Sequence, residues 1–495
     1  MKKILALILA VFMLLPAAVA CSETQDPGTE TENNSASTTA PVADEGTEDL
    51  YDEDGFLKSD LPELDFGGET VTVLYWSDVE MQEYEAEEIN SILVNDAIYR
   101  RNANVEKTLN IEFEWLSTPG NNGKTNEFVT YVGNIYSGGD TNLDLISAYS
   151  RTTAICAIEG YCADMADLPY LNFDMPWWPA SLLDVVSIGD SVYFASGDAS
   201  VNVLHLMYAI YFNKDLIEEY KLENPIELVR NDQWTLDKLI EMTKDSYQDL
   251  DANGKEDVND FFGLVGASWG FDAFYTGSDL RLVEQDADKL LVISEDFYGQ
   301  KAVDLCTKLG QWNQTGDCYI DDSYHQDPFV EGRSIFIQDR CHLADKRLVG
   351  LVDFTYSIVP TPLYNADQED FISVVGNPFS LYALFSASED LDRAAAVLEC
   401  WASEAYRTTT PAQFEMNMKL RYSESSDEAD MYNIIRNTVC FDLGRLFNNR
   451  LNKITDIFYK AAIENQNFAM ISKAQSRALN HGIEGVVEAF KELTE

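Results

Sequence analysis

The order of strands and helices early in the chain constrains its fold more than any other feature. Residues 69–76 alternate β-branched and other side chains after a pair of glycines, which indicates a strand. Apolar residues recur at helical spacing over 87–109, which predicts a helix. Two more strands are predicted at 110–115 and 143–149. Strand, helix and strand in this order are typical of a parallel sheet covered by helices, so we predict an α/β fold.

A second group of elements follows after residue 192. The pattern predicts helices at 213–220 and 232–242, and strands at 262–265, 356–360 and 371–376. Thr235 is the residue type of a helix N-cap, and an apolar helical stretch follows it. The last 90 residues contain few glycines or prolines, and we expect them to be helical.

The N-terminus has the features of a secretory signal. Two lysines precede an apolar run from Ile4 to Ala20, and small residues precede Cys21. The run has 17 residues, which is short for a helix that spans a bilayer, although a single membrane anchor is the alternative. The segment Ala18–Cys21 resembles the lipobox of bacterial lipoproteins, which implies cleavage before Cys21 and lipidation of its thiol. The alternative is an ordinary signal peptide that ends near a cysteine.

The segment after the cysteine differs in composition from the rest of the chain. Residues 22–65 are rich in Asp, Glu, Ser and Thr and have almost no large apolar side chains before Leu50. Such a segment buries too little surface to offset its ordering entropy. We therefore expect residues 1–20 to be the signal peptide, and residues 21–65 to be a disordered acidic tether on the outer face of a bacterial membrane.

The charge of the chain restricts its partners. The formal net charge is −51 at pH 7, which repels nucleic-acid phosphates and argues, more weakly, against anionic ligands. We expect no nucleic-acid partner and a neutral ligand.

Four short motifs occur in the order expected of one known family. They are Tyr211–Leu216 followed by Asn224-Pro225 and Trp234–Leu239, Asp144–Ile146 ahead of Asp164–Leu168, Phe329–Ser334, and Ile358–Pro362. Together they resemble the family 1 extracellular solute-binding proteins of ABC importers, many of which bind carbohydrates. The similarity covers most of residues 69–400, and residues 406–495 match only in being helical.

The resemblance implies a two-lobed, periplasmic-binding-protein-like fold of type II, with mostly parallel sheets covered by helices. Lobe 1 would hold residues 66–195 and a return segment at about 371–420. Lobe 2 would hold residues 196–370, and residues 421–495 form a helical region of unassigned lobe. The family further implies a monomer that captures a small carbohydrate or oligosaccharide and delivers it to an ABC transporter permease. The same fold with a peptide or other ligand, or with a sensing role, is an alternative.

One loop has the spacing of a calcium-binding EF-hand loop. Oxygen ligands stand at loop positions 1, 3, 5, 9 and 12, a backbone carbonyl is expected at position 7, and Gly254 stands at position 6. The expected ligands are Asp249, Asp251, Asn253, Lys255, Asp257 and Asp260. Position 12 is Asp rather than Glu, and its shorter side chain disfavours bidentate binding there. The alternative is an acidic turn held by Asx hydrogen bonds. We expect a structural Ca²⁺ ion.

Candidate ligand contacts follow the predicted strands or flank the expected crossovers between lobes. Ligands of open α/β sheets bind at the carboxyl ends of strands, and sugars need flat aromatic faces and planar polar groups. These criteria select Trp76, Asp78, Tyr149, Asp198, Trp269, Phe271 and Asn377.

The sequence offers little sign of catalysis. There is no H-E-x-x-H or P-loop motif, and the chain has only four histidines. We therefore expect a binding protein and no enzyme, with a surface-anchored carbohydrate-active hydrolase as the rival, because paired carboxylates are easily found among 85 acidic residues. Seven cysteines follow Cys21, an odd number, and buried thiols are favoured over a disulfide framework.

Overall fold

The computed structural model describes residues 50–494, which fall into two compact units, one ending at Leu57 and the other beginning at Lys58. In the first unit, Tyr51 and Leu57 form an isolated antiparallel bridge. The second unit holds all of the larger elements and is described below.

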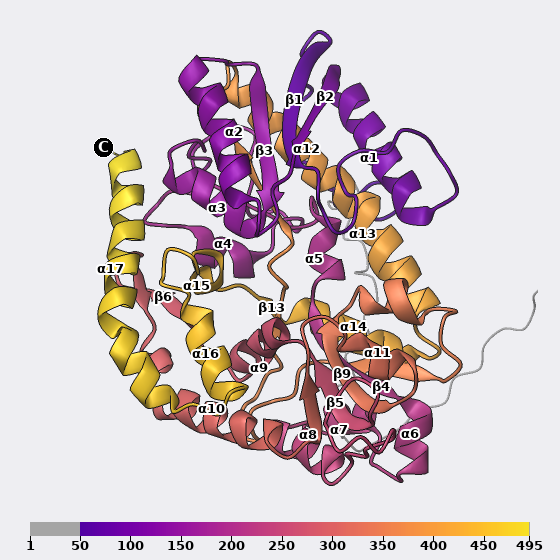
Figure 1. The fold of residues 1–495 in the computed structure, drawn as a ribbon. Helices are drawn as coiled ribbons and strands as arrows, with labels where there is room; N and C mark the ends of the chain where they lie inside the picture. Colours follow the sequence, from indigo (N-terminus) through magenta and orange to yellow (C-terminus); the bar gives the residue numbers. More distant parts are fainter. Residues whose placement is uncertain (1–49, 495) are drawn as a thin grey trace, which may run out of the picture. The chain divides into compact units, whose positions relative to one another are not determined.

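Two sheets organise this second unit (Figure 1). The first has the order β12-β3-β1-β2, with β12 (Ser380–Leu384), β3 (Leu143–Tyr149), β1 (Glu69–Trp76) and β2 (Ile111–Thr118). The second has the order β10-β4-β9-β5-β8, with β10 (Tyr356–Val359), β4 (Tyr208–Asn213), β9 (Ser334–Arg340), β5 (Phe262–Gly266) and β8 (Cys318–Ile320). We call the parts built around them lobe 1 and lobe 2.

Both sheets combine parallel and antiparallel pairs. In lobe 1, β1 pairs in parallel with β2 and β3, as the strand–helix–strand pattern predicts. The returning strand β12 joins the edge antiparallel to β3. In lobe 2, β5 is parallel to β8 and β9, whereas β4 is antiparallel to β9 and β10.

Helices cover each sheet and bury its apolar side chains. In lobe 1 these are α1 (Leu93–Leu109), α2 (Thr125–Gly138), α3 (Ser150–Ile158) and α12 (Leu391–Arg407). In lobe 2 they are α6 (Lys214–Glu219), α7 (Pro225–Arg230), α8 (Leu236–Thr243), α10 (Gln300–Asn313) and α11 (Gln326–Val330). No helix among residues 50–494 is both long and apolar enough to cross a membrane.

Smaller elements lie outside the two main sheets. They are α4 (Ala180–Val186), α5 (Val201–His205), α9 (Asp272–Gly277), the hairpin β6 (Val283–Gln285) with β7 (Leu291–Ile293), and β11 (Ser373–Val374) parallel to β13 (Val439–Cys440). The segment 371–376, predicted as a full strand, therefore keeps only two strand residues.

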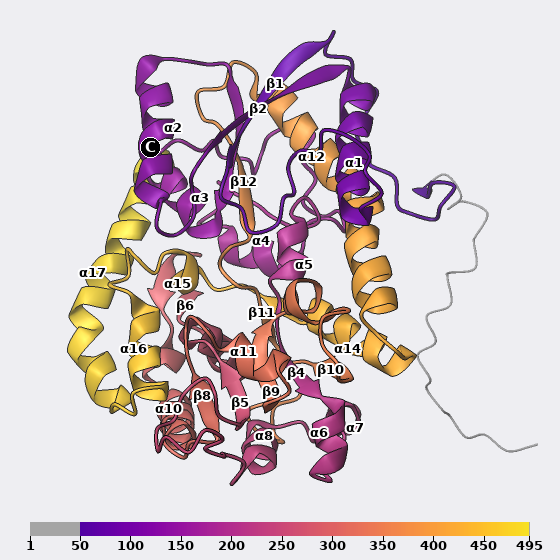
Figure 2. The ribbon, with the colours of Figure 1, turned by 45° about the vertical axis from the view of Figure 1, so that its right-hand side comes forward.

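The C-terminal region is mostly helical, as expected, and it contacts both lobes. It comprises α13 (Thr409–Pro411), a π-helix (Ala412–Arg421), α14 (Ser426–Asn437), α15 (Leu443–Leu446), α16 (Ile454–Ala462) and α17 (Phe468–Thr494). Helix α14 packs on β10, and α16 packs on α10, both in lobe 2. Helix α17 contacts α10 in lobe 2 and α3 in lobe 1, and it runs along one side of this unit in both views (Figures 1 and 2).

Two predicted helices begin later than expected, each for a local reason. The helix predicted from residue 87 begins at Leu93, because Ser91 has a left-handed φ of 68° and its backbone N–H donates to the Asp96 carboxylate. The helix predicted from residue 232 begins at Leu236, because Asp232 has a φ of 55°. Its N-cap is Thr235, as predicted, and the side chain accepts a hydrogen bond from the Lys238 backbone N–H.

Candidate functional site

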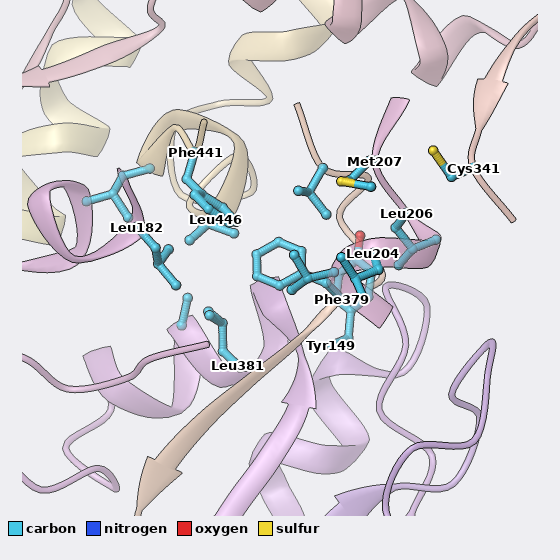
Figure 3. Close-up of a cluster of buried hydrophobic side chains, with 14 of the residues drawn as sticks. Tyr149, Leu182, Leu204, Leu206, Met207, Cys341, Phe379, Leu381, Phe441 and Leu446 are labelled. Atoms are coloured by element: carbon cyan, nitrogen blue, oxygen red, sulfur yellow. The ribbon is translucent and has the colours of Figure 1, made fainter. Parts of the chain in front are cut away.

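Two of the segments on which the chain passes between the lobes pair with each other. Met207 and Val375 form an antiparallel bridge, and the Gly376 backbone N–H donates to the Leu206 carbonyl oxygen at 2.7 Å. Buried apolar side chains surround this crossing (Figure 3). They come from β3, the crossing segments and the C-terminal region, and include Tyr149, Leu206, Met207, Phe379, Phe441 and Leu446. The crossing is thus a thin β connection inside a continuous apolar core.

The topology brings strand ends of both sheets to the crossing. In lobe 1, β3 ends at Tyr149, which pairs with Ser380 at the start of antiparallel β12, and Asn377 lies just before β12. In lobe 2, β9 ends at Arg340, which pairs with Tyr208 at the start of antiparallel β4. Side chains on these ends face one shared space.

That space is a cleft of about 480 Å³. Its walls carry aromatic rings, amide side chains and charged groups from both lobes and from the C-terminal region. The lining residues are Glu80, Asn122, Tyr149, Arg151, Tyr208, Trp269, Arg340, Asn377, Pro378, Asn448, Asn449, Lys453, Thr455, Asp456 and Tyr459. Flat apolar faces beside planar polar groups are the surface that a sugar ring requires.

Trp269 is held between two neighbours in lobe 2. The Arg340 guanidinium lies over its ring, 4.7 Å from the centroid, and the His325 ring meets it edge-on at 5.4 Å. His325 in turn lies 3.3 Å from the buried Asp339 carboxylate, measured from Nε2 to Oδ2. Gly376 leaves room for the arginine, since a Cβ there would lie 2.8 Å from Arg340 Cδ. The orientation of the indole is therefore set by its neighbours within lobe 2.

The lobe 1 wall presents Tyr149 and Asn377. The Ser150 hydroxyl donates to the Asn377 carbonyl oxygen at 2.7 Å, which fixes the loop before β12. Asn377 Oδ1 is buried and accepts no hydrogen bond from the described residues. Burial raises the pKa of Tyr149, although the positive charges of Arg151 and Arg445 oppose the rise, so its hydroxyl stays a hydrogen-bond donor at neutral pH.

The C-terminal region ties the two walls together. Arg445 donates from Nε to the Asp272 carboxylate of lobe 2 at 3.0 Å, and Tyr459 donates to the same carboxylate at 2.8 Å. The Arg445 carbonyl oxygen accepts from Arg151 Nε of lobe 1 at 2.8 Å. One buried residue of α15 thus contacts both lobes beneath the cleft.

A direct ion pair also spans the lobes. Glu80, in the loop after β1, lies 3.2 Å from Arg340 Nη1 at the end of β9. The same carboxylate lies 3.6 Å from His342 Nδ1 and 3.7 Å from Lys346 Nζ. A lobe 1 acid is therefore surrounded by basic groups of lobe 2 at the rim of the cleft.

The structure places three of the seven predicted contact residues on the cleft walls, namely Tyr149, Trp269 and Asn377. Trp76 and Phe271 have no exposed surface and pack in the core, where Trp76 donates to the Tyr84 hydroxyl.

The other two predicted residues have structural partners outside the cleft lining. Asp78 accepts backbone N–H groups of Gly120 and Asn121 and braces that loop. Asp198 is partly exposed and lies beside Thr410 and Arg436 in a separate hollow.

Several cleft residues were missed at the sequence level. Arg340 ends a parallel strand, and the strand-end rule could have selected it. Tyr208 begins a strand, and it reaches the cleft only because β4 is antiparallel to β9. Asn448, Lys453 and Tyr459 lie in the C-terminal region, and no local pattern predicts which sheet edge that region approaches.

The predicted calcium loop has converging oxygen atoms. Carboxylate oxygens of Asp249, Asp251 and Asp260 lie within 4.8 Å of one another. Asn253 Nδ2 donates to both Asp251 and Asp257 at 2.9 Å. The Lys255 carbonyl oxygen accepts from the Tyr247 hydroxyl at 3.4 Å. The donor set contains only oxygen atoms, which fits a hard cation such as Ca²⁺.

Burial suppresses ionisation of the cysteine thiols among residues 50–494. The seven in the described part of the chain are free thiols, and all but Cys440 are buried. Burial raises the pKa of Cys400 to about 12 and that of Cys440 to about 11, so neither is a reactive thiolate at neutral pH. Cys21 and the predicted signal peptide lie outside the described residues.

Solved structures share the fold over most of the chain. A cyclo/maltodextrin-binding protein complexed with maltotetraose matches with a TM-score of 0.55 at 10% identity, over 86% of this chain and 97% of the other. The maltose-binding protein MalE from Listeria monocytogenes, in complex with maltose, matches with a TM-score of 0.55 at 13% identity, over 84% and 98%. A sugar transporter from Rhizobium etli in an open conformation matches with a TM-score of 0.53 at 13% identity, over 85% and 99%.

At these identities the likeness establishes the fold, and it confirms the predicted type II periplasmic-binding-protein-like architecture. No protein-family model and no curated protein matches the sequence.

Proposed function

We propose that this chain, whose fold is that of the type II periplasmic binding proteins, is an extracellular solute-binding protein that captures a carbohydrate for an ABC transporter. The observation that carries the proposal is the cleft between the lobes, lined by Trp269, Tyr149 and Tyr208 together with amide side chains. Solved structures with the same fold hold maltotetraose and maltose. The order of the sequence motifs supports the same family.

The chemistry of the walls suits a sugar. The partly exposed face of Trp269 offers a stacking surface for C–H groups of a pyranose ring. Asn377 Oδ1 lacks a partner in the described residues and can accept a hydrogen bond from a hydroxyl group. These groups come from different lobes, so a ligand that contacts both stabilises the closed arrangement by its differential contacts. The closed form would dock on the permease.

The test is a glycan screen on purified protein. We expect selected oligosaccharides to raise the melting temperature and to bind with measurable heat, while chromatography recovers the glycans unchanged. Recovery of cleaved glycan would support the hydrolase. If only peptides raise the melting temperature, the protein is a binding protein of the same fold whose ligand is a peptide.

We also propose that loop 249–260 binds Ca²⁺ as a structural ion. Asp249, Asp251, Asn253 and Asp257 would supply side-chain oxygens, Lys255 its carbonyl oxygen, and the buried Asp260 the last carboxylate. The loop links α8 to β5, so the ion would brace lobe 2 away from the cleft.

The location of the protein belongs to the same proposal. We infer export through the N-terminal signal and anchoring of Cys21 by lipid at the outer face of the membrane. Each buried acyl methylene contributes about 0.8 kcal/mol, so two or three chains hold a protein firmly.

A further inference from the structure

The charge of the cleft differs from the charge of the chain. Five charged side chains line it: Glu80, Arg151, Arg340, Lys453 and Asp456. Basic groups outnumber acidic ones there by three to two, whereas the whole chain has 85 acidic and 34 basic residues. A basic cleft in so acidic a chain concentrates anions locally.

One basic group of the cleft is already neutralised. Arg340 pairs with Glu80 at 3.2 Å, and this carboxylate also faces His342 and Lys346. The Arg340 charge therefore serves the contact between the lobes and the stacking on Trp269.

Arg151 is different, because it has no acidic partner among residues 50–494. It is 8% exposed, and its Nε donates to the Arg445 carbonyl oxygen at 2.8 Å. Its Nη1 lies 3.5 Å from Asn122 Oδ1, a long contact. Both partners are neutral, although buried guanidinium groups are normally paired with carboxylates. Lys453, exposed at the start of α16, also has no ion pair within the described residues.

We propose that the ligand is an acidic carbohydrate whose carboxylate pairs with Arg151 while a sugar ring stacks on Trp269. This inference rests on the proposed function and makes its ligand more specific. The planar guanidinium fork matches a carboxylate in two parallel hydrogen bonds. A singly charged carboxylate fits one uncompensated buried arginine, whereas Glu80 and Asp456 on the same walls disfavour a dianionic phosphate. The net charge of the chain predicts a neutral ligand, whereas the charged side chains that line the cleft favour an acidic one.

The experiment compares uronate oligosaccharides with their carboxyl-reduced counterparts, in which each carboxylate is replaced by a primary alcohol. Calorimetric titration should show at least about tenfold tighter binding of the acidic member, the amount that one charge-assisted contact typically supplies. The preference should shrink as salt is added. A phosphorylated sugar of similar size should bind more weakly than the uronate.

Variants assign the preference to a residue. Arg151→Gln should abolish the preference, so that the acidic and the carboxyl-reduced glycans bind within about twofold of each other, because the charge-assisted contact to the carboxylate is lost. Arg450→Gln is the matched control, since Arg450 is exposed, pairs with Glu159 and does not line the cleft. Should Arg151→Gln fail to fold, Lys453→Gln removes an exposed cleft charge and should reduce the preference in a folded protein.

Two outcomes overturn the inference in distinguishable ways. Equal or tighter binding of the reduced glycans, or of the phosphorylated sugar, would remove the carboxylate preference and leave carbohydrate binding intact. Failure of every glycan, acidic or neutral, to bind the folded protein would remove the proposed function as well.

Discussion

Trp269 is the residue whose removal should reduce ligand affinity most. Its ring is positioned by Arg340 and His325 and has a partly exposed face toward the cleft. We expect Trp269→Ala to weaken oligosaccharide binding by about tenfold or more, the range of a buried aromatic anchor. Titration calorimetry checks this, with Tyr131→Ala, an exposed ring on α2, as the control. Unchanged affinity in the Trp269 variant would place the ligand elsewhere.

Glu399 should make stability depend on pH. Its carboxylate accepts the indole N–H groups of Trp177 and Trp178 at 2.8 and 2.9 Å. Burial raises its pKa to about 7 against these hydrogen bonds, so the folded state holds the proton more tightly than the unfolded state. The stabilisation of the folded state by the protonated Glu399 side chain is complete below pH 4.5 and is lost as the pH rises through 7. The free energy of unfolding should therefore fall by about 2–3 kcal/mol between pH 5 and pH 8.

Urea unfolding of the protein and of Glu399→Gln measures this change as a difference between the two. The free energy of unfolding of the unmodified protein minus that of Glu399→Gln should fall from pH 5 to pH 8. The same quantity for Glu415→Gln, at an exposed site, should show no such trend. A pH-independent difference for Glu399→Gln would contradict the assignment.

At this scale the sequence predicts positions better than side-chain directions. Tyr149 and Trp76 both end strands of lobe 1, yet only Tyr149 reaches the cleft. Helices cover both faces of this sheet, so its apolar strands do not alternate in a way that tells one face from the other. The rings meet edge-on at 5.8 Å, with Trp76 packed beneath Tyr149.

Among the elements, the loop between α8 and β5 gives the sharpest test. If Ca²⁺ binds there, it stabilises the folded state by about 2.7 kcal/mol at a hundredfold excess over its Kd. We expect millimolar Ca²⁺ to raise the melting temperature relative to chelator, and Asp251→Asn to reduce that shift. Asp288→Asn, in the exposed turn of the β6–β7 hairpin, should retain it. Equal melting temperatures in calcium and chelator would exclude a stabilising ion.

Element prediction succeeded where the signal is local. The Thr235 cap and the parallel β1–β2 and β1–β3 pairs follow from side-chain type and order. The antiparallel strands β4 and β12 depend on contacts between distant segments, and these strands bring Tyr208 and Asn377 to the cleft. That is why Tyr208, on the lobe 2 wall, was not predicted.

At the scale of the whole molecule, the C-terminal region contacts both lobes instead of extending one. Arg445 bonds to Asp272 in lobe 2 and accepts from Arg151 in lobe 1. If the lobes move about the crossing near Met207 and Val375, α15 and α16 must therefore either move with one lobe or change their contacts with both. The last family motif is Ile358–Pro362 and the similarity ends near residue 400, so the resemblance contains no information about this bridge.

Anchoring is also a property of the whole chain. We expect Cys21→Ser to release the protein from the membrane fraction into the medium or periplasm with its glycan affinity unchanged, because the lipid acts far from the cleft. Cys440→Ser, at a half-buried thiol, should remain in the membrane fraction. Retention of the Cys21 variant on the membrane would favour an uncleaved N-terminal anchor.

The most direct measurement is a crystal structure of the protein with the tightest glycan from the screen. The account predicts one ligand enclosed by both lobes, with a ring on Trp269 and polar contacts to Asn377 and Arg151. A glycan bound to one lobe alone, or at a hollow away from the crossing, would contradict it.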